Sequence, residues 1–287
     1  MPLCPHCNGE VPETALRCRH CRRNLTIKPP SVPFIQRIMV NLEPGSPAWS
    51  IGEVLLLWTL VFAANFLIAH TEFIHAFMRV LRYRYFLLVQ EPALYFHLYS
   101  FMATFALKIS AVLFIWIILS IRRVPFMEGL ALNRPVKKEW LWLFPAVALF
   151  SLTCRLISDV DPLSPNLPVY LFFESASATG IITALFSIVI LAPVAEEIFF
   201  RGFVFPGLNK RLGLYGSSLA TAALFAAVHI PQNRENLSVI WVIFAGGLIF
   251  SFVRAVTRST TMAILLHALY NGTILLAGFI RYWICKY

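Results

Sequence analysis

The chain has 287 residues, of which 59% are hydrophobic and 13% are charged. A soluble domain carries about a quarter charged residues, and the apolar residues here fall in long uncharged runs without a polar face, which excludes a cytosolic or secreted globular enzyme. The net charge of +10 is typical of a membrane protein whose Lys and Arg occupy cytoplasmic loops and contact anionic lipids, so we expect membrane lipids and no nucleic acid as partners.

Four cysteines open the chain in a C-x2-C-x10-C-x2-C pattern: Cys4, Cys7, Cys18 and Cys21. Two such pairs can close around one tetrahedral Zn²⁺, and the metal would supply the folding free energy that so short a segment lacks. A pair of disulfides would need an oxidising compartment, and residues 1–30 contain no signal-peptide core. The pattern resembles a bacterial-type zinc-ribbon knuckle and predicts a structural zinc module over residues 1–24.

A proline-rich linker follows over residues 25–50, and the membrane part is expected over residues 51–287. A bilayer core needs about 20 apolar residues per helix. Seven segments come close to that length: 51–69, 93–121, 139–157, 175–200, 215–230, 237–253 and 260–280. Residues 72–90 mix Phe with Arg, which indicates an interfacial helix or an eighth span. The predicted fold class is therefore all-α, a polytopic transmembrane helical bundle behind a small zinc-ribbon-like module.

Basic residues predict the orientation of the bundle. The first 48 residues carry six Lys or Arg, and the loops at 122–138 and 201–214 are basic as well, whereas the loop at 158–174 has three acids and no base. Because Lys and Arg favour cytoplasmic loops, we expect a cytoplasmic N-terminus. The zinc-ribbon-like start is typical of prokaryotes, so we expect an integral protein of a prokaryotic cell membrane.

Two adjacent glutamates lie late in the apolar segment 175–200. Glu197 and Arg201 are four residues apart, so they share a helical face and can form an ion pair in the favourable order. Glu196 points about 100° away and has no counter-charge of its own in this pattern, which suits it to exchange a proton as a general base or acid. A structural ion-pair network would explain Glu197 and Arg201 but not the second acid.

Two later segments each supply a histidine with a partner four residues away, as Phe225-x-x-x-His229 and His267-x-x-x-Asn271. Such spacing places both members of a pair on one helical face. Together with the two glutamates, these residues predict a polar cluster on three helices inside the membrane, nearer the cytoplasmic side. Lys108, in an earlier apolar segment, is expected to snorkel or to pair within the bundle.

The ordered motifs Glu-Glu-x-x-x-Arg, Phe-x-x-x-His and His-x-x-x-Asn resemble the CPBP family of intramembrane proteases. That family includes the CAAX prenyl endopeptidases and the bacteriocin-processing and self-immunity proteins. The similarity covers residues 139–280, which we take as the catalytic core, and leaves out the cysteine array and the first two spans.

The resemblance implies an intramembrane endopeptidase that hydrolyses a membrane-delivered peptide or protein. Glu196 would activate water with help from His229, while His267 and Asn271 would stabilise the oxyanion. Glu197 and Arg201 would shape the site.

In a rival mechanism, Glu196, His229 and His267 hold a catalytic Zn²⁺. The helical Glu-Glu lacks the HExxH arrangement of common zinc proteases, so the metal-independent mechanism is favoured.

A second hypothesis is a non-catalytic membrane adaptor or bacteriocin-immunity protein whose zinc-ribbon module recruits a cytosolic partner. A transporter is a third hypothesis, because buried Glu and His can relay protons. The sequence has no repeated half, which argues against a transporter.

Overall fold

The computed structural model describes residues 49–70, 92–133, 185–233 and 237–286, with scattered positions elsewhere. The chain divides into two compact units, Met1–Asn41 and Leu42–Tyr287. The predicted zinc module and linker lie almost entirely outside the described residues, as do the segment 72–90 and most of the span at 139–157. Cys7 and Cys21 are described, but Cys4 and Cys18 are not.

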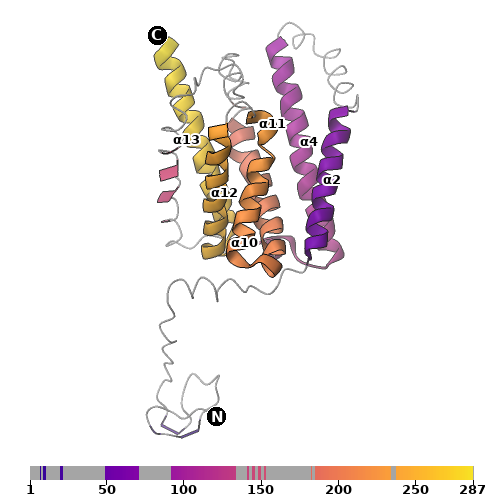
Figure 1. Ribbon diagram of the computed structural model, residues 1–287, viewed down its shortest axis with the longest axis vertical. Coiled ribbons are helices and arrows are strands. Elements are labelled where there is room, and N and C mark those ends of the chain that lie inside the picture. The colour runs from indigo at the N-terminus through magenta and orange to yellow at the C-terminus, as the bar shows by residue number, and fades with distance from the viewer. Residues whose placement is uncertain are drawn as a thin grey trace. The chain divides into compact units, whose positions relative to one another are not determined.

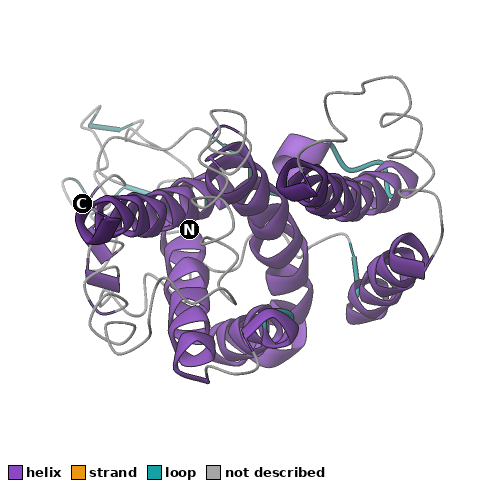
Figure 2. Cartoon of the chain, turned by 90° about the horizontal axis from the view of Figure 1, so that it is seen from above, coloured by secondary structure: helices purple, strands orange, loops and turns teal. Residues whose placement is uncertain are grey.

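The second unit is a bundle in which α2, α4, α10, α12 and α13 run alongside one another (Figure 1). Seen from above, its described residues are mostly helical, with loops and turns at helix ends (Figure 2). The elements, with η marking π-helical turns, are α2 (Ile51–His70), α4 (Pro92–Ile121), α5 (Phe126–Gly129), η3 (Leu185–Leu191), α9 (Ala192–Glu197), η4 (Ile198–Val204), α10 (Phe205–Ala227), α11 (Ile230–Asn233), α12 (Leu237–Thr257) and α13 (Thr260–Lys286). The predicted helical class is confirmed for the described residues.

Two described helical stretches, Leu237–Thr257 and Thr260–Ala277, are long and apolar enough to cross a membrane. Two shorter apolar stretches, Ile51–Ala64 and Phe105–Ile121, belong to α2 and α4. Helices therefore occupy the ranges predicted at 51–69, 93–121, 237–253 and 260–280, while a set of seven complete spans stays a prediction.

The prediction of a basic loop at residues 201–214 is wrong. From Leu185 to Ala227, η3, α9, η4 and α10 follow one another without an intervening loop. The bend between the two halves of α10 falls at Gly213, whose φ of +64° is a conformation that side-chain-bearing residues rarely adopt. The span predicted from residue 215 is therefore the second half of α10.

Five exposed basic side chains nevertheless lie at one end of the bundle. The last turns of α4 and α12 and the first turns of α10 and α13 lie at that end (Figure 1). Its exposed cations are Arg122, Arg123, Lys210, Arg211 and Arg258. This distribution is typical of the cytoplasmic face of a membrane protein.

Trp49 ties the start of α2 to η4. Its indole Nε1 donates to the Phe203 carbonyl at 3.0 Å, and the two rings stack with centroids 4.8 Å apart. Gly207 leaves room for this contact, because a Cβ there would lie 3.2 Å from the indole and 2.5 Å from Val54. This contact fixes η4, the π-helical turn that carries Arg201, against the start of α2.

Residues 130–133, which we call the strap, bind the turn between α12 and α13. The Thr260 backbone N–H donates to Ala131 O at 2.9 Å. The Thr260 hydroxyl donates to Leu130 O and accepts from Arg254 Nε at 3.0 Å. Leu130 is fully buried. The strap therefore connects the chain after α4 to the first turn of α13.

Replacing Thr260 with Val keeps the side-chain shape but leaves Leu130 O and Arg254 Nε without this partner. We expect the free energy of unfolding to fall by about 1–3 kcal/mol, measured by thermal unfolding of the detergent-purified protein. Thr261→Val, which removes a hydroxyl outside the strap, is the control and should change stability by less than about 0.5 kcal/mol. Equal stability of the two variants would contradict this role of the strap.

Candidate active site

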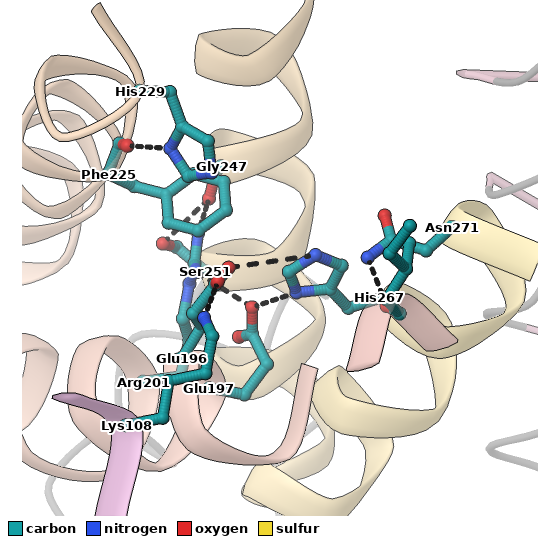
Figure 3. Close-up of polar contacts among 11 residues, drawn as sticks. Lys108, Glu196, Glu197, Arg201, Phe225, His229, Gly247, Ser251, His267 and Asn271 are labelled. Carbon is teal, nitrogen blue, oxygen red and sulfur yellow. Dashed lines mark hydrogen bonds and ion pairs between the residues drawn. The ribbon is translucent and has the colours of Figure 1, made fainter. Parts of the chain in front are cut away.

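The predicted site residues come from three parts of the bundle. Glu196 and Glu197 end α9, and Arg201 follows in η4. His267 and Asn271 lie one turn apart on α13 (Figure 3). His229 was expected within a helix, but α10 ends at Ala227 and His229 lies in the turn that follows.

Glu197 and Arg201 form the predicted ion pair, which is confirmed. Arg201 Nη1 lies 2.9 Å from Glu197 Oε1, and both side chains are completely buried. Arg201 Nη2 donates to the Gly247 carbonyl at 2.8 Å. The guanidinium carbon lies 4.6 Å from the Phe225 ring centroid and 5.3 Å from that of Phe250, so aromatic faces cover the cation.

Gly247 allows α10 and α12 to approach closely enough for this contact. A Cβ at Gly247 would lie 3.1 Å from both the Cα and the Cβ of Ala222 on α10, and 3.4 Å from Arg201 Nη2. A side chain at 247 would push against backbone, which cannot move away as a flexible side chain can. The glycine therefore brings its own carbonyl within reach of the arginine.

His267 is oriented by the same carboxylate oxygen. Its Nδ1 lies 2.8 Å from Glu197 Oε1, and its ring stacks on Phe250 with centroids 4.7 Å apart. Because an ionised carboxylate can only accept, Nδ1 carries the hydrogen, and in a neutral imidazole the lone pair is on Nε2. That Nε2 lies 4.0 Å from Glu196 Oε2.

Glu196 has a counter-charge, contrary to the sequence-based expectation. Lys108 Nζ on α4 forms an ion pair with Glu196 Oε1 (Figure 3). The two side chains are 15% and 18% exposed. The pattern of motifs missed Lys108 because its partner is 88 residues away. The only signal was a cation in the middle of an apolar helix, and the sequence left snorkelling and pairing as alternatives.

The charges within the cluster balance. Glu196 and Glu197 are matched by Lys108 and Arg201. Since a net charge in apolar surroundings is costly, this pairing leaves neither carboxylate without a counter-charge.

His229 has its tautomer set by the backbone. Its Nδ1 lies 2.7 Å from the Phe225 carbonyl oxygen, which can only accept, so Nδ1 carries the hydrogen. The ring lies 4.9 Å from that of Phe225, as the Phe-x-x-x-His spacing predicts. His229 is close enough to Glu196 for an electrostatic interaction.

Asn271 connects α13 to η3. Its Nδ2 donates to the Ile188 carbonyl at 2.9 Å, so the backbone of a π-helical turn fixes the carboxamide. π-helical turns inside α-helices are frequent at functional sites, and here they flank α9 on both sides.

The described residues give no support to a metal at this site. Among them, no three His, Cys, Asp or Glu side chains are grouped closely enough to hold an ion. Lys108 also pairs with Oε1 of Glu196, so a metal ion on this carboxylate would lie beside another cation. The described residues around Glu196 therefore do not favour a metal ion.

Comparison with known proteins gives two matches. Residues 178–273 match the family model described as type II CAAX prenyl endopeptidase Rce1-like, which supports the resemblance to the CPBP family. An uncharacterized 24.3 kDa protein of Escherichia coli is 30% identical over 128 residues, which cover 44% of this chain and 58% of that relative. No solved structure matches the chain significantly.

The buried ion pair predicts a non-additive pattern of stability. Arg201→Met leaves the Glu197 charge buried without its partner, and Glu197→Gln leaves that of Arg201, so each change should cost about 3–5 kcal/mol. The double variant should cost less than the sum of the two. Thermal unfolding in detergent measures the three variants against wild type. Additive losses would contradict direct coupling between the two residues.

Proposed function

We propose that the protein is an intramembrane endopeptidase that hydrolyses a peptide bond with a water activated by Glu196. The observation that carries this proposal is the 4.0 Å separation between Glu196 Oε2 and His267 Nε2. That separation is too long for a hydrogen bond but suits two acceptors bridged by one water. Such a water donates both hydrogens and has a lone pair left for attack.

The proposed reaction transfers one proton at each stage. Glu196 takes a proton from the water as the water oxygen bonds to the substrate carbonyl carbon, and the carbonyl π electrons move onto its oxygen. The resulting oxyanion collapses, the C–N bond breaks, and the leaving nitrogen takes the proton from Glu196. Asn271 would lie beside the reacting group, and fixed donors and charges in a site that excludes water stabilise such an intermediate strongly.

The substrate we propose is a peptide or protein delivered through the membrane. The apolar bundle supports this choice, since few soluble peptides would reach a site between apolar helices. The similarity to CAAX prenyl endopeptidases makes a lipid-modified C-terminal peptide one candidate. We further propose that the basic end of the bundle faces the cytoplasm of a prokaryotic cell.

Glu196→Gln should abolish cleavage while keeping the size of the side chain. We expect loss of general-base catalysis to lower activity by about 100-fold or more. Comparing the membrane proteomes of cells that contain wild-type protein or the variant identifies peptides cleaved by wild type alone, and purified proteins in proteoliposomes then give the rates. Glu128→Gln, an exposed acid on α5, is the control and should behave as wild type.

Cleavage by Glu196→Gln at the wild-type rate would rule out the proposed function. Wild-type protein that binds the candidate peptides but hydrolyses none would favour the adaptor hypothesis instead. The same preparations therefore separate an enzyme from a binding protein.

We also propose a structural zinc ion at Cys4, Cys7, Cys18 and Cys21. Purified protein should contain about one zinc per chain, measured by elemental analysis, and replacing all four cysteines with serine should remove it without lowering the cleavage rate. A variant with serine at Cys154 and Cys285 is the matched control and should keep the metal. Activity that is lost with the zinc and regained on its return would contradict a purely structural role.

A further inference from the structure

Lys108 lies outside every motif that defines the site. It is near the middle of α4 (Pro92–Ile121), whereas the family match begins at residue 178. Figure 3 shows its side chain extending from α4 to Glu196. Any function of Lys108 is therefore additional to what the comparison assigns.

The other cation and the histidine next to Glu196 both bind Glu197. Arg201 binds Glu197 and the Gly247 carbonyl, and His267 Nδ1 also binds Glu197. Among the described residues, no Lys or Arg other than Lys108 forms a salt bridge with Glu196. The two carboxylates thus have separate cations, each from a different helix.

A contribution to folding does not account for this lysine. Placing a lysine at the centre of a membrane helix is costly, and an ion pair with Glu196 returns only part of that cost. The partial exposure of the pair, 15% for Lys108 and 18% for Glu196, places it where a substrate can approach.

We propose that Lys108 is a positioning residue for the hydrolytic carboxylate, an inference that rests on the proposed function. Lys108 holds Glu196 by Oε1, so that Oε2 remains on the side of His267 Nε2. When Glu196 takes the proton from water, the negative charge moves to the substrate oxygen. The ammonium stays in place and offsets that charge through space.

The kinetic test compares Lys108→Met with Lys108→Arg in proteoliposomes, using a membrane peptide that wild type cleaves and Glu196→Gln does not. Lys108→Met should lower kcat by about tenfold or more while KM changes by less than about twofold, because the loss falls on the transition state. Lys108→Arg keeps the positive charge and should recover kcat to within about fivefold of wild type. Ile109→Met, at a half-exposed neighbouring position, is the control.

A stability cycle tests the pair without relying on activity. Lys108→Met and Glu196→Gln each leave one charge without its partner, so the double variant should unfold at a higher temperature than additive effects predict. Additive shifts in the unfolding temperature would contradict the ion pair.

The outcomes separate this inference from the proposed function. Lys108→Met with a wild-type kcat, or Lys108→Arg as slow as Lys108→Met, would overturn the role of Lys108 while the Glu196 mechanism stands. Activity in Glu196→Gln, or no cleavage by wild type, would overturn both.

Discussion

The buried ion pair between Glu197 and Arg201 is the constraint around which the second half of the chain is arranged. Both side chains are fully buried, and an unpaired charge in such surroundings costs several kcal/mol. The guanidinium therefore needs every partner it has: a carboxylate, the Gly247 carbonyl and the faces of aromatic rings. Meeting these needs sets the distance between η4, α10 and α12, and explains why glycine occupies position 247.

The geometry of the reactive groups follows from this ion pair. Glu197 Oε1 accepts from Arg201 and also from His267 Nδ1, so one oxygen fixes both the cation and the tautomer of the imidazole. Glu196 is the preceding residue on the same helix, and its direction relative to His267 is therefore set by the helix itself. The buried Glu197 therefore positions His267, and the partly exposed Glu196 is the carboxylate available to react.

The sequence predicts those parts of the site that depend on short spacings. Glu197 with Arg201, and Phe225 with His229, are four residues apart, and helical geometry brings each pair together. The contacts that the sequence does not predict join residues far apart in the chain: Lys108 with Glu196, Arg201 with Gly247 and Thr260 with Leu130. No local periodicity encodes such contacts, because they depend on which helices become neighbours. The prediction of a basic loop at 201–214 was wrong for a related reason. Arg201 lies within a helix because tertiary partners stabilise its charge there.

The dependence on distant helices bears on how the site works. A base that must be charged between apolar helices needs a cation, and Arg201, in the π-helical turn that follows the glutamates, is already paired with Glu197. The second cation must then come from another helix, and α4 supplies it through Lys108. The strap after α4 is hydrogen-bonded to the first turn of α13, the helix that carries His267. The lysine and the histidine on either side of Glu196 are thereby held by one connected framework, so a shift of α4 against α13 would change the setting of the carboxylate between them.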